Sequence, residues 1–216
     1  MPSDKPVGIR PTSFALPGHS EGRSIVQSAS IIIVGGSLVG LSASLFLSWR
    51  GVQNLVVERH AGSSPHPRAM GFTETTLEHY RTVGIGHLIP QTPVGTRLRR
   101  VTVESLSGTW REEIEWTPGE AADRSENLSP CTGAAIAQDR LEPILREAAL
   151  SAGSQLWLGT ELVGFDQRDD AVVARLRRLS DGYEWSVSAD YMIAADGADS
   201  AIREELGISR DGVGHL

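Results

Sequence analysis

The sequence is poor in cysteine, in lysine and in net positive charge. Its 216 residues include a single cysteine, Cys131, which excludes an internal disulfide or a cysteine-based metal cluster and fits a reducing cytoplasm. Acidic residues (27) outnumber basic ones (20), the formal net charge is −7, and Lys5 is the only lysine. Nucleic acid is therefore not an expected partner, because binding it requires a basic surface.

An uninterrupted long hydrophobic run is also missing. Positions 31–48 come closest, but Gly35, Gly36 and small polar residues break the run. This favours a buried strand and helix over a membrane span. Positions 1–30 are polar, rich in Pro, Gly and Ser, and lack the apolar core of a signal peptide, so we expect a disordered leader there.

A strand, a glycine-rich turn, a helix and a second strand are indicated between Ile31 and Glu58. The β-branched run 31–34 is typical of a buried parallel strand, and the turn after it opens an apolar stretch that ends at Trp49. Positions 55–57 predict the second strand, with Glu58 at its tip. This order is that of a dinucleotide-binding βαβ unit, in which the pyrophosphate meets the helix N-terminus and the ribose meets the acid.

The glycine fingerprint departs from its G-x-G-x-x-G template at the middle position. The three template positions hold Gly35, Ser37 and Gly40. The first supplies the tight turn, and the third lets the helix pack close to the strand. The serine is either tolerated there or bonds the phosphate. A purely structural turn is the alternative, but Glu58, 23 positions after Gly35, favours the dinucleotide site.

The rest of the chain shows helical and strand patterns in alternation. Helices are predicted at 74–83, 138–152 and 200–206, and strands at 98–104, 110–116, 155–166, 171–179, 183–189 and 191–195. The last strand delivers Asp196 and Gly197 at its carboxyl end, where open α/β sheets bind ligands. Asp196 could accept a hydrogen bond from a ribose or from a backbone amide, while Asp199 or Ser200 caps the next helix.

A loop rich in proline and glycine, 59–68, follows Glu58. Its Arg68 is either a phosphate partner or a solvated surface residue. His60 and His66 have no cysteine or carboxylate cluster beside them in sequence, so no metal site is expected. No Ser-His-Asp spacing is present, and we identify no catalytic acid or base.

Four segments share their motifs with one enzyme family. They are IVGGSLVGLSASLFLSWRGV, LVVERHAGSSPHPRAMGFTETTLEHYRTVGI, AIAQDRLEPILREAALSAG and MIAADGADSAIREELGI. Together they resemble the class A FAD-dependent monooxygenases, which are p-hydroxybenzoate-hydroxylase-like. The likeness runs from Ile31 to Leu216 and is greatest to the aromatic polyketide hydroxylases of anthracycline and angucycline pathways. Their glycine motif has a serine-containing variant like the one here.

This resemblance implies FAD as cofactor and NAD(P)H as co-substrate. Glu58 would hold the adenosine ribose, Arg68 and Gln138 would approach the FAD, and Asp196 and Gly197 would lie near the pyrophosphate and the nicotinamide route. The implied cofactor-binding residues are Gly35, Ser37, Leu38, Val39, Gly40, Glu58, Arg59, Arg68, Gln138, Asp196 and Gly197.

The implied fold is α/β: a Rossmann-like FAD-binding domain of the glutathione-reductase type, with a βαβ unit and a β-meander, plus part of a β-sheet substrate domain. By the resemblance, 31–93 and 131–208 form the FAD-binding domain, 94–130 is a partial substrate-domain insertion, and 209–216 begins a truncated remainder. The family's later Gly-Asp motif, which binds the flavin ribityl chain, and the thioredoxin-like domain usual in the polyketide branch are not found. The chain is thus expected to be an N-terminal portion, with a second chain as one source of the missing half.

The implied activity is cytoplasmic hydroxylation of an aromatic, polyketide-like substrate with O2 and NAD(P)H. Baeyer–Villiger oxygenation on the same scaffold is one alternative. A second is a non-catalytic remnant or the FAD-binding half of a split enzyme. A nicotinamide dehydrogenase is a third, and the Asp196-Gly197 segment argues against it.

Overall fold

The computed structural model describes residues 27–63, 68–93, 101–112 and 129–212. Two compact units are present, one formed by 1–67 together with 138–216, and the other by 68–137. The substrate-domain insertion was expected at 94–130, a narrower range than the second unit. Most of the expected leader lies outside the described residues, but its last four positions belong to the first strand.

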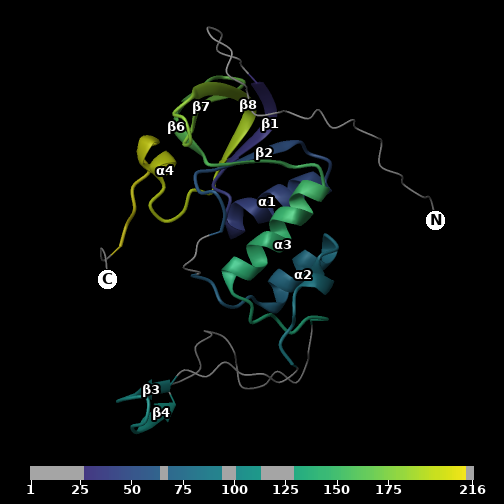
Figure 1. Ribbon diagram of the computed structural model, residues 1–216, viewed down its shortest axis with the longest axis vertical. Coiled ribbons are helices and arrows are strands. Elements are labelled where there is room, and N and C mark those ends of the chain that lie inside the picture. The colour runs from purple at the N-terminus through teal and green to yellow at the C-terminus, as the bar shows by residue number, and fades with distance from the viewer. Residues whose placement is uncertain (1–26, 64–67, 94–100, 113–128, 213–216) are drawn as a thin grey trace, which may run out of the picture. The chain divides into compact units, whose positions relative to one another are not determined.

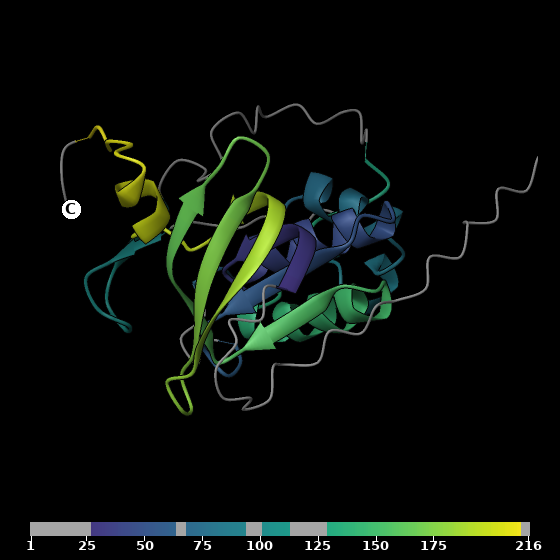
Figure 2. The same cartoon turned by 90° about the horizontal axis from the view of Figure 1, so that it is seen from above.

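The first unit is built on a six-stranded mixed sheet of order β5-β2-β1-β8-β7-β6 (Figure 1). Its strands are β1 (Gln27–Val34), β2 (Asn54–Glu58), β5 (Gln155–Leu158), β6 (Thr160–Gln167), β7 (Val172–Arg178) and β8 (Glu184–Ala194). β1 pairs in parallel with β2 and β8, and β2 pairs in parallel with β5. β6, β7 and β8 form the predicted antiparallel meander, shown green to yellow in Figure 2.

Two helices of this unit, α1 (Leu38–Trp49) and α3 (Gln138–Ser151), pack against each other (Figure 1). The buried side chains of α1 include Leu41 and Leu45, and α3 buries Leu141 and Leu145. Each such leucine contributes about 1.5–3 kcal/mol by leaving water. This packing brings the N-terminal ends of α1 and α3 close together, as the hydrogen bonds of Ser37 with Gln138 and Glu142 show.

Alternation along β1 gives the sheet two apolar faces. Ile32 and Val34 join a cluster with Trp157, Phe165 and Trp185 from β5 and the meander strands. Ile33 is just as buried but lies outside that cluster, facing α1 instead. Successive side chains on a strand point to opposite faces, so one strand supports both the meander and the helical layer.

The last predicted strand is not a separate element. Positions 184–194 form one strand, β8, where the sequence predicted 183–189 and 191–195 with a break at Asp190. Its first half pairs antiparallel with β7, and its length from Val187 onward pairs in parallel with β1. The predicted strand 155–166 is instead divided, since Gly159 separates β5 from β6. The short helix α4 (Ala201–Glu205) follows β8.

The second unit contains α2 (Glu74–Thr82), the 3₁₀ turn η1 (Gly86–Leu88) and the hairpin of β3 (Val101–Val103) with β4 (Trp110–Glu112). α2 matches its prediction closely, with Thr73 as N-cap accepting from the Thr76 N–H. The hairpin matches positions 101–103 and 110–112 of its two predicted strands. Glu104 lies just past the end of β3, and the other predicted positions, 98–100 and 113–116, lie outside the described residues. None of the described helices is both long and apolar enough to cross a membrane.

Candidate functional site: a glycine turn at the start of α1

The turn between β1 and α1 is packed so tightly that it accepts only glycine at two positions. Gly35 has φ +106°, and a Cβ there would lie 2.2 Å from the Ala195 carbonyl oxygen at the end of β8. A Cβ on Gly40 would lie 1.8 Å from the Gly35 carbonyl oxygen and 3.4 Å from Ile33 Cγ2. The helix was expected to approach the strand at Gly40, and Ile33 of β1 does lie next to this position. The Gly35 carbonyl of the turn itself lies even closer to Gly40.

The first turn of α1 is left without a side-chain cap. Ser37 occupies the N-cap position in extended conformation, but its side chain makes no capping bond, and the first turn holds no acidic residue. The first N–H groups of a helix have no intrahelical partner, and together with the helix dipole they favour an anion. Leu38 is partly exposed and Val39 is 70% exposed, so this end of the helix is open to a ligand.

Glu58 is tied to the same turn. Its Oε2 accepts a 2.7 Å hydrogen bond from the Gly36 N–H, and a Cβ on Gly36 would lie 2.7 Å from Glu58 Cβ. Its Oε1 accepts from the His60 N–H at 2.8 Å and lies 2.6 Å from His60 Nδ1. The Glu58 side chain is 12% exposed. An ionised carboxylate has about four acceptor sites, so capacity remains for a ribose hydroxyl.

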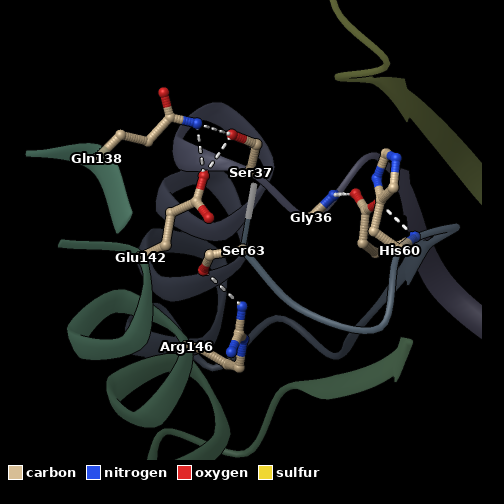
Figure 3. A network of polar contacts seen from close by, with 8 residues as sticks. Gly36, Ser37, His60, Ser63, Gln138, Glu142 and Arg146 are labelled. Atoms are coloured by element: carbon tan, nitrogen blue, oxygen red, sulfur yellow. Dashed lines mark hydrogen bonds and ion pairs between the residues drawn. The ribbon is translucent and has the colours of Figure 1, made fainter. Parts of the chain in front are cut away.

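Gln138 and Ser37 meet in a small polar network (Figure 3). Gln138 Nε2 lies 2.9 Å from Ser37 Oγ and 2.8 Å from Glu142 Oε1, and Ser37 Oγ lies 2.6 Å from the same carboxylate oxygen. Four residues further along α3, Arg146 Nη2 donates to Ser63 Oγ at 3.1 Å. α3 thus contacts both the glycine turn and the loop after Glu58.

Asp196 turns back to its own chain. Its Oδ1 accepts from the Ser200 hydroxyl at 2.6 Å and its Oδ2 from the Ile202 N–H at 3.3 Å, while Ser200 Oγ accepts from the Arg203 N–H. The backbone-amide alternative for Asp196 and the capping role for Ser200 therefore both occur. Gly197 follows at an exposed position.

The two arginines predicted at the cofactor are both exposed. Arg59 follows Glu58 directly. Arg68 belongs to the other compact unit, and its approach to FAD stays a prediction.

Three residues of the site were not identified from the sequence: Gly36, His60 and Glu142. Gly36 adjoins a template glycine, and His60 lies two residues after the acid. Glu142 follows Gln138 by one helical turn, so the two share a face of α3. Among the described residues, no group of three His, Cys, Asp or Glu side chains could hold a metal ion.

The site combines a parallel βαβ unit, an uncapped helix start and an acid at the tip of the second strand. This combination is typical of a dinucleotide site. The model of the FAD-binding-domain family matches residues 28–216, and the chain belongs to that family. The expected α/β fold of an FAD-binding domain is thereby confirmed.

The chain is similar to hydroxylases of aromatic polyketides. It is 41% identical over 191 residues to aklavinone 12-hydroxylase DnrF from Streptomyces peucetius subsp. caesius. This match covers 86% of this chain and 39% of DnrF. Among solved structures it resembles the flavin-dependent monooxygenase PieE in complex with FAD and substrate, with TM-score 0.77, 34% identity and coverage of 86% of this chain and 33% of PieE. It also resembles aklavinone-11 hydroxylase in a ternary complex with FAD and aklavinone, with TM-score 0.74, 36% identity and coverage of 87% and 36%. The chain thus spans between 33% and 39% of the length of these relatives.

Proposed function

We propose that this chain binds the adenosine and pyrophosphate end of FAD, within a cytoplasmic, NAD(P)H-dependent monooxygenase that hydroxylates an aromatic, polyketide-like substrate. The observation that carries this proposal is the bond between Gly36 and Glu58, which joins an uncapped helix start to the acid of the second strand. Phosphate and ribose are recognised side by side by such an arrangement.

The residues present fit that end of the cofactor. Gly35 and Gly40 keep the turn free of side-chain atoms that would displace its backbone. The N–H groups of Leu38 and Val39 would donate to the pyrophosphate at the helix N-terminus. Glu58 would accept from the ribose through acceptor sites that Gly36 and His60 leave open. Arg59 and Arg68 would add positive charge to the phosphate's surroundings.

The bound flavin would supply the redox chemistry with NAD(P)H and O2, and the protein would orient and shield it. The hydroxylase names of the relatives support an aromatic substrate, and the ternary complex with FAD and aklavinone supports a polyketide-like one. Because the chain spans 39% of DnrF, we place the remaining contacts to the flavin ring and the substrate in polypeptide outside these 216 positions. That polypeptide would continue this chain or belong to a second one.

A titration with FAD, ADP and FMN tests the proposal. The 216-residue chain is mixed with FAD, and binding is followed by flavin fluorescence. We expect ADP to compete with FAD, because it carries the adenosine and the pyrophosphate. FMN, which lacks the adenosine, should compete poorly. Absence of FAD binding, or equal competition by FMN, would overturn the assignment.

Oxygen transfer needs a separate assay. With FAD, NADPH and an aromatic polyketide, we expect the chain alone to yield hydrogen peroxide rather than hydroxylated product, since water would reach an uncovered flavin. Coupled product formation by the chain alone would contradict this expectation. Addition of a polypeptide matching the rest of DnrF should shift the yield from peroxide to product if the complementing part is supplied by a second chain.

A further inference from the structure

Glu142 is a buried carboxylate that is held by neutral hydrogen-bond donors. Its residue is 2% exposed, and among the described residues none forms an ion pair with it. Its Oε1 accepts instead from Ser37 Oγ at 2.6 Å and from Gln138 Nε2 at 2.8 Å. Burial of an ionised carboxylate is costly unless hydrogen bonds satisfy it. Two neutral donors therefore hold this group at the start of two helices, close to where a phosphate would bind.

The donors and acceptors of this network can be counted. The Ser37 hydroxyl carries a single proton, and it donates that proton to Glu142 Oε1 at 2.6 Å. The two Nε2 protons of Gln138 are directed to Ser37 Oγ and to Glu142 Oε1. Ser37 thus has no proton left for a phosphate oxygen. Of the two roles that the sequence left open for Ser37, direct bonding to phosphate conflicts with this arrangement.

We propose that Glu142 is a positioning residue: it acts through Ser37 and Gln138 to fix the glycine turn, so that backbone N–H groups of α1, and not the Ser37 hydroxyl, meet the pyrophosphate. The proposal deepens the function proposed above and rests on it. A serine at the middle template position introduces a hydroxyl that a glycine would not have, and Glu142 engages that hydroxyl. The bond from Ser37 to Glu142 also ties the start of α1 to α3.

Arg146 extends the same face of α3 toward the second loop. Gln138, Glu142 and Arg146 are spaced by four residues, which places them in line along one side of the helix. Arg146 holds Ser63 in the loop after β2, and Figure 3 shows all three side chains directed to the same side of α3. One helix face therefore positions both loops that flank the expected ribose and pyrophosphate.

The test compares two ligands that differ in the pyrophosphate. Affinities for ADP and for adenosine are measured by NMR titration of the 216-residue chain and of its variants Ser37→Ala, Glu142→Leu and Glu142→Gln. We expect the Ser37→Ala and Glu142→Leu variants each to lose about tenfold in ADP affinity, because each lacks the hydrogen bond between Ser37 and Glu142. Their adenosine affinity should not change. Glu142→Gln should recover part of the loss, because it keeps one acceptor oxygen for Ser37.

A double variant separates positioning from direct contact. If Glu142 acts through Ser37, the Ser37→Ala/Glu142→Leu pair should bind ADP no worse than the weaker single variant. Additive losses, or a Glu142→Leu variant that binds ADP as well as the wild type or better, would overturn the proposal. Glu147→Gln, an exposed neighbour on the same helix, removes the same charge and should change nothing.

Two further results keep the test decisive. Thermal unfolding of each ligand-free variant shows whether it is folded. If Glu142→Leu does not fold, the Ser37→Ala variant is compared with the double variant Ser37→Ala/Glu142→Gln. We expect both to bind ADP with the same affinity. A lower ADP affinity of the double variant would refute the proposal. A wild-type chain that binds neither FAD nor ADP would instead refute the proposed function.

Discussion

The Gly36 N–H donates a 2.7 Å hydrogen bond to Glu58 Oε2, across 22 positions of sequence. This bond joins the turn after β1 to the tip of β2. The absence of a Cβ on Gly36 permits it, since a Cβ would lie 2.7 Å from Glu58 Cβ. The acid thus holds the turn in place, and in the function proposed here it would also accept from a ribose.

Replacement of Glu58 by alanine should weaken FAD binding. The variant loses a charge-assisted hydrogen bond to the ribose, a contribution of about 1.5–3 kcal/mol, and it also releases the Gly36 N–H. Glu58→Gln should lose less, because one acceptor oxygen survives. Fluorescence titration with FAD measures both effects, and an unchanged affinity in Glu58→Ala would remove this residue from the site.

Replacement of Gly40 by valine should disrupt the turn more severely than replacement of Ser37 by glycine. Even the Cβ atom would lie 1.8 Å from the Gly35 carbonyl oxygen, so the helix must shift away from the turn, at a cost typical of overpacking of about 1–3 kcal/mol or more. Urea unfolding and FAD titration report the two consequences. Gly71→Ala is the control, since its Cβ would make an ordinary 3.5 Å contact. Normal cofactor binding by Gly40→Val would show that the fingerprint is misaligned.

Asn54 should be important for stability rather than for ligand binding. It is 4% exposed, its Oδ1 accepts from the hydroxyls of Ser44 and Ser154, and its Nδ2 donates to Ser48 Oγ and to two backbone carbonyls. Asn54→Ala should lower the free energy of unfolding by about 1–3 kcal/mol, because these buried groups lose their partners. Urea denaturation measures this loss. The exposed neighbour variant Gln53→Ala should unfold like the wild type.

The parts of the site that the sequence predicted are those encoded by neighbouring residues. The βαβ unit from Ile31 to Glu58 lies in one continuous stretch, so apolar runs, glycines and the terminal acid indicate it together. The cap at Ser200, one of the two candidates for the start of α4, was visible for the same reason. It depends on a bond to the Arg203 N–H, three residues later.

The parts that the sequence did not predict depend on distant partners. Glu142 is 105 positions from Ser37, and nothing around either residue indicates the other. β8 appeared as two strands because the polar Asp190 interrupts the apolar pattern, whereas strand continuity is set by pairing with both β7 and β1. If the G-x-G-x-x-G template alone decided the outcome, Ser37→Gly would be harmless. In the structure this change removes a hydrogen-bond donor from the buried carboxylate of Glu142.

Asp196 offers a final test, of a residue that the resemblance placed near the cofactor and whose two oxygens bond α4. Asp196→Ala removes acceptors from the Ser200 hydroxyl and the Ile202 N–H, so α4 should fray, at a cost like that of a lost N-cap, about 0.5–2 kcal/mol. Hydrogen exchange of the α4 amides should therefore become faster in the ligand-free chain. Asp199→Ala is the matched control, because its side chain is 91% exposed and 3.5 Å from Arg210. Exchange as slow as in the wild type, combined with loss of FAD binding, would instead assign the Asp196 carboxylate to the ligand.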